Sequence, residues 1–436
     1  MFKLTDEQEN ILNNINNWYY NNIDDQFLEY TGPAGSGKTM LLRSSIDTLK
    51  LDINEDVLAL SVTGSAVNNL RSLGFTNAAT IQKGLYIHTY YDQYNNQYYD
   101  KKRFIDQKIK LVVVDEAQSL STSDIHALKN SGIKAILCGD SNQWSLYQSS
   151  GFGLNNKEKI FTLTKVLRQA QNSDIVTIAN NILNETRFNI NEISLTSDIQ
   201  IMPYSQFKQT CMFIIPNYDI IISNRNVIRN WFNFFIKEYI YGNFGLYIYI
   251  NDRIVCKRNY WKQSVMSSDN IKISLTNGLI GRSAKNSTYN QFLANKGCLM
   301  IDFIPDIYPV TFKNLEISLR YLKDLYILYL NTNIEDQILN EDPIKIEEIS
   351  TLNDEIIESS NIYSNHEIFD YAYCLTTAFT QGREFRSGIF IQDNYTYKNN
   401  NEKIRYNELI YTALTRFTDK CLFVIPDNIM SDLFII

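Results

Sequence analysis

The segment Gly32–Thr39 constrains the fold of this chain more than any other feature of the sequence. It reads Gly-Pro-Ala-Gly-Ser-Gly-Lys-Thr and matches the pattern G-x-x-x-x-G-K-[ST] in full. The apolar run 27–31 precedes it and predicts a buried strand, and the pattern at 40–50 predicts a helix directly after it. A glycine-rich turn between a strand and a helix places backbone N–H groups and a helix N-terminus around one point, which is where proteins bind phosphate.

Each residue type in this turn has its own chemical task. The glycines let the backbone N–H groups turn inward around a β-phosphate. Lys38 is expected to reach the β- and γ-phosphates, and the Thr39 hydroxyl is expected to ligate Mg²⁺. The predicted nucleotide contacts are therefore Gly32, Gly35, Gly37, Lys38 and Thr39.

Two adjacent carboxylates end a second buried strand, in the sequence Leu-Val-Val-Val-Asp115-Glu116. Asp115 is expected to hold Mg²⁺ through its water shell, and Glu116 to polarise an attacking water. An Asp-Glu pair alone would suit any polar strand end. Following a phosphate-binding turn, it predicts hydrolysis of a nucleoside triphosphate.

Phosphoryl transfer also needs cations at the γ-phosphate in the transition state. Arg168 and Arg416 are the candidates, because each lies beside a strand or helix predicted for a second domain. Taken singly, either arginine is more often a surface residue than a finger.

Strand and helix patterns alternate along the chain, which predicts doubly wound parallel sheets. With 436 residues, two or three domains are expected. We predict a first domain over 1–159, a second over 160–276 plus 362–436, and a small β insert over 277–361 that ends in an acidic stretch.

An aromatic and polar segment at about 86–107 interrupts the first domain. Tyrosine-rich arms flank Asn95-Asn96, which predicts an inserted β-hairpin. Its tyrosines, above all Tyr94 and Tyr98, could stack on nucleic-acid bases. They could equally pack the hairpin and reflect AT-rich coding.

Composition sets limits on the class of protein. A formal net charge of −7 argues against coating nucleic acid with bulk positive charge, although a local groove needs only a few cations. The six cysteines have no C-x-x-C spacing, so no zinc or iron–sulfur site is expected. No apolar run approaches the roughly 20 residues of a membrane span, so we expect no membrane partner and a cytoplasmic location.

The order of these pieces resembles that of superfamily 1 helicases, specifically the RecD-like and Dda-like branch 1B, over nearly the whole chain. Thr5-x-x-Gln8 looks like the Q motif, whose glutamine reads adenine. The resemblance places Thr63 and Thr80 on the phosphates of DNA, Gln143 at the γ-phosphate, and Gly382 and Glu384 near the nucleotide. It also implies that Arg168 and Arg416 are arginine fingers.

Two motifs depart from the family pattern. The family has His then Lys where this chain has Ala378 and Phe379, which leaves Thr376 and Thr377 as candidate DNA contacts on strand geometry alone. Gln82 also stands where the family has His.

The resemblance implies an α/β chain with two RecA-like doubly wound parallel-sheet domains, an inserted β-hairpin and a small SH3-like β insert. It implies an ATP- and Mg²⁺-dependent DNA helicase, monomeric, moving 5′ to 3′ on single-stranded and fork DNA with replication or recombination proteins as partners. AT-rich coding and size suggest a phage protein acting in the host cytoplasm.

Other functions remain open at this point. The chain could be a translocase that separates no strands, or a motor on RNA. A binding protein with a degenerate ATPase fold and a simple kinase-like enzyme are further alternatives.

Overall fold

The structure is a computed structural model, and the chain forms two compact units. The first comprises Met1–Asp92, Gln97–Ser173 and Gln381–Arg383, and the second comprises Asp174–Thr380 and Glu384–Ile436. Each unit is described by itself below. The described residues are 4–22, 25–91, 97–102, 108–145, 160–165, 173–186, 188–189, 197–242, 246–258, 260–268, 272–288, 297–339, 351, 366–395, 399–429 and 434–435.

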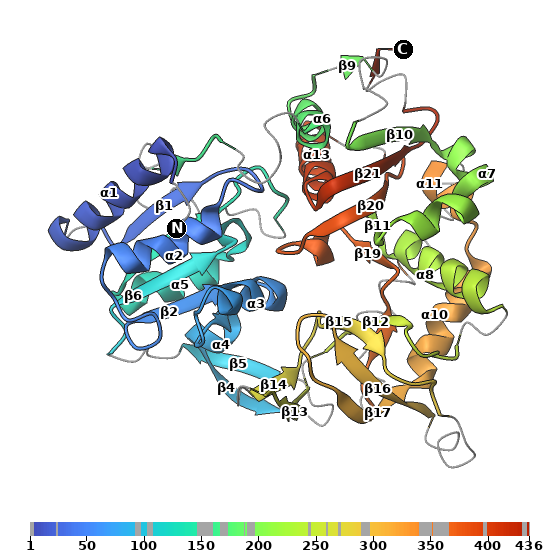
Figure 1. Ribbon diagram of the computed structural model, residues 1–436, viewed down its shortest axis with the longest axis horizontal. Helices are drawn as coiled ribbons and strands as arrows, with labels where there is room; N and C mark the ends of the chain where they lie inside the picture. Colours follow the sequence, from blue (N-terminus) through green and yellow to red (C-terminus); the bar gives the residue numbers. More distant parts are fainter. Residues whose placement is uncertain are drawn as a thin grey trace. The chain divides into compact units, whose positions relative to one another are not determined.

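A six-stranded parallel sheet forms the centre of the first unit (Figure 1). Its strand order is β3-β2-β6-β7-β1-β8. The apolar β-branched runs seen in the sequence become strands that are buried on both faces, as a covered parallel sheet requires. The strands are β1 (Phe27–Thr31), β2 (Val57–Ser61), β3 (Ala79–Thr80), β6 (Leu111–Asp115), β7 (Lys134–Gly139) and β8 (Ile160–Thr162).

Helices cover both faces of this sheet. Three helices pack their apolar residues on one face, and two helices with the 3₁₀ turn η1 (Ala117–Ser119) cover the other. Those on the first face are α1 (Asp6–Asn21), α2 (Lys38–Thr48) and α3 (Gly64–Ser72), and those on the second are α4 (Ile81–Leu85) and α5 (Thr122–Ser131). The first doubly wound sheet is thus confirmed.

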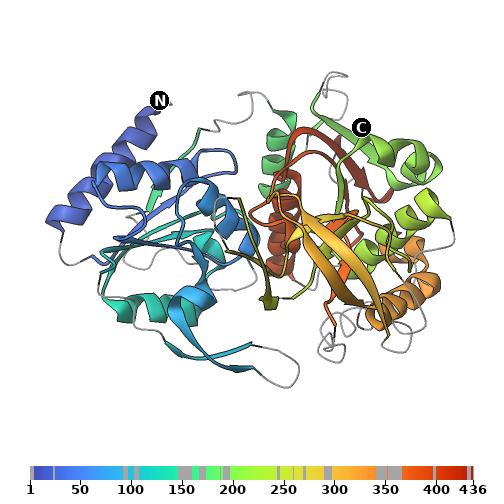
Figure 2. The same cartoon turned by 60° about the horizontal axis from the view of Figure 1, so that its bottom comes forward.

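The inserted hairpin is also confirmed. β4 (Tyr86–Tyr91) and β5 (Gln97–Lys102) pair antiparallel, with Tyr86 opposite Lys102. In Figure 2 these blue strands run out beyond the sheet and helices of their own unit. The Tyr86 hydroxyl donates to Asp124 Oδ1 on α5 at 2.8 Å, which fixes the base of the hairpin.

The second unit contains a five-stranded parallel sheet of order β10-β21-β20-β11-β19. α6 and α13 cover one face, and α7, α8 and α11 cover the other. The second doubly wound sheet is therefore confirmed too. Its strands are β10 (Ile199–Pro203), β11 (Ile220–Ser223), β19 (Cys374–Thr376), β20 (Phe385–Ile391) and β21 (Phe417–Ile425), and its helices are α6 (Asp174–Leu183), α7 (Tyr204–Ile214), α8 (Asn226–Tyr241), α11 (Ile334–Leu339) and α13 (Asn400–Leu414).

A smaller antiparallel sheet, of order β17-β16-β15-β12-β18, belongs to the second unit. Its apolar residues form a separate core with α10 (Leu319–Asn331) and Phe234 of α8. Its strands are β12 (Arg253–Cys256), β15 (Ile280–Ser283), β16 (Cys298–Pro305), β17 (Phe312–Ser318) and β18 (Phe369–Tyr371). The remaining elements are η4 (Ile215–Asn217), η6 (Ala378–Thr380), the pair β13 (Tyr260–Met266) and β14 (Lys272–Leu275), and the pair β9 (Phe188–Asn189) and β22 (Phe434–Ile435).

The structure corrects the expected domain bounds. β8 pairs with β1, so the first unit continues past residue 159 to Ser173. The small β sheet begins at Arg253 rather than at 277 and includes β18, while α10 and α11 lie within the span expected to be β. Most of the acidic stretch falls outside the described residues. Among the described residues, no helix has the length and apolar character needed to cross a membrane.

Candidate nucleotide site

The turn between β1 and α2 has the backbone that the glycine pattern predicts. Gly35 and Gly37 adopt φ values of 78° and 82°, a left-handed region that costs other residues about 1–2 kcal/mol. Gly32 is needed for a different reason. A Cβ atom there would lie 2.8 Å from Leu163 Cβ and 2.8 Å from Ser36 Oγ, so no side chain fits without displacing its neighbours.

Lys38, the first residue of α2, turns its side chain back over the loop. Its ammonium group donates to the carbonyl oxygens of Gly32 and Pro33, each at 2.8 Å. These carbonyls hold the cation beside the backbone N–H groups of the turn. A bound phosphate would find the positive charge already at the loop.

Asp115, at the end of β6, accepts three hydrogen bonds. Thr39 Oγ1 lies 3.1 Å from its Oδ2, while Glu116 N and Cys138 Sγ lie 3.0 and 3.3 Å from its Oδ1. Burial, followed by the charge of Glu116, raises the pKa of the Asp115 carboxyl to about 6, against opposing contributions from Cys138, Lys38 and Thr39. A cation beside this carboxylate would offset the cost of its burial.

The donor set fits magnesium. Mg²⁺ prefers oxygen ligands at about 2.0–2.1 Å in an octahedron, which places adjacent ligand oxygens about 2.9 Å apart. The Thr39 hydroxyl and the Asp115 carboxylate are both oxygen donors, and they are separated by 3.1 Å. Thr39 and Asp115 are therefore the residues that would hold the ion, directly or through its water shell.

Glu116 has a strained backbone, with φ 57° and ψ 41°. A non-glycine residue in this region is uncommon, and such strain concentrates at functional sites. Gln118 donates from Nε2 to the Glu116 carboxylate, and Gln118 Oε1 accepts from the backbone N–H of Asp140 at 3.2 Å. Gln143 Nε2 in turn donates to Asp140 Oδ2 at 3.1 Å.

These bonds connect the candidate water-activating carboxylate to Gln143, the candidate γ-phosphate sensor. Sequence reasoning found Glu116 and Gln143 but assigned no role to Gln118, whose only signal was its place in the Asp-Glu-Ala-Gln string. It also missed Cys138, because a thiol that binds a carboxylate across two strands leaves no local pattern.

Gln8 lies at the loop, as the Q-motif resemblance implies. Thr5 and Gln8 form a capping box at the start of α1, and Gln8 Nε2 donates to the carbonyl of Ser36 at 3.3 Å. Its exposed fraction is 4%, so in this structure Gln8 braces the phosphate loop. Contact with adenine stays a prediction.

Thr63 follows β2, and Thr80 is the last residue of the neighbouring parallel strand β3; each is the N-cap residue of the next helix. Their hydroxyls accept from Ala66 N at 3.2 Å and from Lys83 N at 3.4 Å. The structure thus brings the two predicted phosphate contacts to one edge of the first sheet. A Cβ atom at Gly382, in the segment assigned to this unit, would lie 3.1 Å from Ala66 Cβ, so Gly382 lies beside α3.

Two of the four predicted residues described in the second unit, Thr377 and Arg416, are held internally. Thr377 is fully buried, and its hydroxyl donates to Asn224 Oδ1 at 2.9 Å, so it serves the fold in this structure. Arg416 is 3% exposed and donates to the carbonyl of Thr412 at 3.0 Å and to Thr415 Oγ1 at 3.2 Å. Thr376 is half-buried at the end of β19, and Glu384 is exposed.

Three predicted residues fall wholly or partly outside this description. Arg168 and Tyr94 lie outside the described residues. Tyr98 is on β5 opposite Tyr90, and only its backbone is described. Their roles stay predictions.

A family model described as an AAA domain matches residues 3–199, which include the phosphate loop and the Asp115 strand. No curated protein matches the chain in sequence.

Among solved structures, the Bacteroides Pif1 helicase bound to single-stranded DNA is similar at a TM-score of 0.51 and 15% identity, over 99% of this chain and 96% of that one. The Pif1 helicase of Candida albicans is similar at a TM-score of 0.49 and 14% identity, over 100% of this chain and 97% of that one. The chain therefore has the two-RecA-domain fold of the Bacteroides protein, as the resemblance to superfamily 1B helicases implied.

Proposed function

We propose that this chain is an ATP-driven DNA helicase that translocates 5′ to 3′ on single-stranded DNA. The observation that carries the proposal is the cluster in the first unit: a phosphate loop with its lysine in place, an oxygen pair spaced for Mg²⁺, and a strained glutamate beside it. The solved structure that shares this fold is a helicase bound to single-stranded DNA, which supports the choice of substrate.

The residues divide the chemistry of hydrolysis between them. The loop amides and Lys38 would bind the β- and γ-phosphates and neutralise charge that develops there. Magnesium, when bound by Thr39 and Asp115, supplies further charge stabilisation. Glu116, held by Gln118, would accept a proton from the attacking water, and Gln143 would report the presence of the γ-phosphate through Asp140.

Arg168 and Arg416 are the proposed arginine fingers. Support for Arg168 comes from the chain that leads to it. Thr164 N donates to Glu7 Oε2 of α1 at 2.9 Å, and Leu163 lies against Gly32 of the phosphate loop. Arg416 stands at the turn between α13 and β21, where the 1B resemblance puts the second finger.

The β4–β5 hairpin is the proposed strand-separating element. It starts directly after α4, whose N-cap is Thr80, so one short helix joins a proposed DNA contact to the hairpin. Stacking of its tyrosines on bases at a fork would contribute about 1–3 kcal/mol each. Deleting residues 92–98 should abolish unwinding and leave DNA-stimulated ATPase in place; loss of both would reject the assignment.

One set of assays tests the proposal as a whole. ATP hydrolysis should rise on adding single-stranded DNA and rise less with RNA of the same sequence. Unwinding should need a 5′ single-stranded tail, and a duplex with only a 3′ tail serves as the matched control. ATPase stimulation without unwinding would point to a translocase, and stimulation by RNA alone to an RNA motor. No stimulation by either polymer would contradict the proposal.

We also propose that the chain acts as a monomer in the cytoplasm, as a phage-encoded protein with replication or recombination proteins as partners. This rests on the sequence resemblance and on AT-rich coding. Sedimentation of the chain with and without a DNA oligomer tests the monomeric state.

A further inference from the structure

Lys257 is a cation of the second unit that forms no ion pair with any residue that the structure describes. It follows β12, and its backbone N–H donates to the carbonyl of Ile368 at 2.9 Å, which fixes where the side chain starts. Its ammonium group lies 4.9 Å from the centroid of the Phe379 ring. Within the described part of the chain, that ammonium makes no hydrogen bond and no ion pair.

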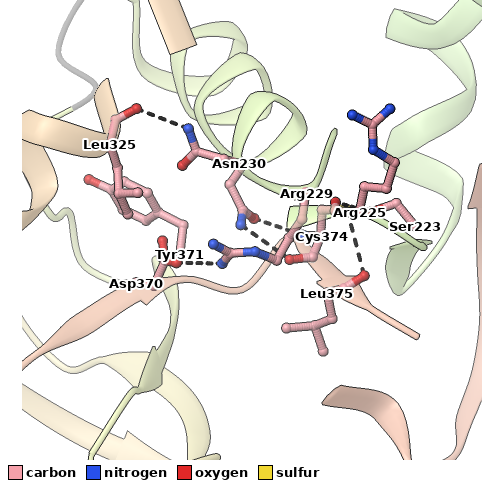
Figure 3. A network of polar contacts seen from close by, with 10 residues as sticks. Ser223, Arg225, Arg229, Asn230, Leu325, Asp370, Tyr371, Cys374 and Leu375 are labelled. Atoms are coloured by element: carbon pink, nitrogen blue, oxygen red, sulfur yellow. Dashed lines mark hydrogen bonds and ion pairs between the residues drawn. The ribbon is translucent and has the colours of Figure 1, made fainter. Parts of the chain in front are cut away.

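Asp370, a carboxylate whose charge acts on Lys257, is already engaged. Arg229 of α8 forms a buried ion pair with Asp370 Oδ2, and Asp370 Oδ1 accepts from the backbone N–H of Tyr371 at 2.8 Å. Figure 3 shows the guanidinium of Arg229 directed at Asp370, inside a network of polar contacts that also includes Asn230 and Cys374. Both Asp370 oxygens are therefore used, and neither is bonded to Lys257.

The surroundings disfavour the charged amine. Burial, followed by repulsion from Arg229, lowers the pKa of Lys257 to about 8, although Asp370 and Cys256 oppose the shift. These three side chains, on α8, β18 and β12, are the ionisable groups that act on it. An anion beside the amine would favour its protonated form and raise the pKa again.

Phe379, the ring beside this cation, lies in the 3₁₀ turn η6, which follows β19. One part of the ring packs on the core formed by α6 and α13, while the residue stays half-buried. Thr376, three residues before Phe379 in the sequence, is the half-buried residue at the end of β19 for which a DNA contact was predicted. A lysine over an aromatic ring combines the two groups that bind single strands, a cation for phosphate and a face for a base or sugar.

We propose that Lys257 binds a backbone phosphate of the single strand, with Phe379 as the surface on which the amine and the adjacent nucleotide rest. This inference rests on the proposed function. It also gives a physical reason for an aromatic residue at position 379, since the cation comes from a different element of the fold.

The test is a titration of the full chain with a fluorescent single-stranded DNA oligomer at several salt concentrations. Lys257→Gln should weaken binding about 5–10-fold and reduce the slope of log K against log salt by about 0.7, the value for one lost contact to single-stranded DNA. Lys420→Gln is the matched control, because Lys420 also lies 4.9 Å from an aromatic ring, that of Tyr218, in the same unit. The control should change binding less than about 2-fold, in line with an exposed surface substitution.

A pH series separates this role from a structural one. An amine with a pKa near 8 loses its charge as pH rises, so wild-type affinity should fall about 5–10-fold between about pH 7 and about pH 9. Lys257→Arg stays charged over this range, so its affinity should not show that fall. Thermal unfolding of each variant checks that the fold is intact.

The outcomes distinguish the inference from the proposed function. If wild type binds single-stranded DNA but Lys257→Gln keeps the same affinity and salt slope, the inference is wrong and the proposed function stands. An equal loss in Lys420→Gln, or the same pH dependence in Lys257→Arg, also rejects the inference. If wild type does not bind single-stranded DNA, both fail.

Discussion

The two parallel sheets both lead from a strand into a long helix, but the two turns are built differently. Gly32–Gly37 connects β1 to α2 with two left-handed glycines, whereas Asn224 and Arg225 alone connect β11 to α8. Asn224 Nδ2 donates to Asp393 Oδ1 at 3.3 Å, and Arg225 donates to the carbonyl and the side chain of Gln337 at 3.1 and 2.8 Å. The second turn is short and its side chains are bonded to protein.

The polar residues that follow the two turns also differ in what they bind. Around α2, Lys38 bonds to carbonyl oxygens of the loop and Thr39 bonds to Asp115, and a nucleotide and Mg²⁺ would replace these contacts. Along α8, Arg229, Asn230 and Asn233 are bonded to fixed groups of the same unit. A glycine-rich turn thus leaves Lys38 available for a candidate phosphate site in the first unit, whereas the short turn of the second unit is bonded to the protein around it.

The largest expected effect is on ATP hydrolysis, and it should follow from a change at the start of α2 but not from one just before α8. Lys38→Ala should lower kcat for ATP hydrolysis by about 10²–10³-fold, because it removes the cation that stabilises charge at the phosphates. Arg225→Ala should instead lower the free energy of unfolding by about 1–2 kcal/mol, because it breaks the bonds to Gln337. Steady-state ATPase and urea unfolding measure the two effects. A comparable loss of kcat in Arg225→Ala would contradict the division between the turns.

The Arg229–Asp370 pair tests whether the α8 network is structural. Asp370→Ala should lower the free energy of unfolding by about 3–5 kcal/mol, because the buried guanidinium loses its counter-charge. Replacing both residues, with Arg229→Met and Asp370→Leu, should recover most of that loss, since neither charge then remains buried. Urea unfolding of the three proteins measures this. A double variant as unstable as the single one would show that the pair does more than balance charge.

Removing the charge of Asp115 should change the free energy of unfolding in the opposite direction to removing that of Asp370. In the absence of Mg²⁺ and nucleotide, the pKa of its carboxyl is raised to about 6 from 3.8, so the folded state holds the proton more tightly than the unfolded state. The ionised carboxyl therefore costs stability above about pH 6, and this cost disappears as pH falls through 6 toward 4. Asp115→Asn should be more stable than wild type by about 1–3 kcal/mol at about pH 8, with a smaller difference at about pH 4.5. A difference that does not change with pH would reject this account.

Local patterns were enough to find the residues of the phosphate loop and the Asp115–Glu116 pair, because glycine spacing and a strand end are written in adjacent positions. They also predicted both parallel sheets and the hairpin. They misplaced β8, whose three residues carry no pattern that assigns them to the first sheet rather than the second. They placed β12 outside the β insert, because its pairing with β15 and β18 joins segments far apart in sequence.

Side-chain roles that depend on tertiary contacts could not be read from the sequence. Thr377 looked like an accessible strand-end residue, and only the structure shows its hydroxyl bonded to Asn224. No local pattern singled out Lys257. Asp370, a carboxylate whose charge acts on Lys257, is bonded to Arg229, which lies 141 positions away in the sequence.

The contact between Gly32 and Leu163 has a mechanical consequence. The main chain that leaves β8 passes directly over the phosphate loop, with no space between Gly32 and Leu163 for even a methyl group. Thr164 and Lys165, the next residues, are bonded to Glu7 of α1. If the loop shifts when phosphate enters or leaves, Leu163 must shift with it, and the bonds of Thr164 and Lys165 would pass that shift to Glu7 of α1.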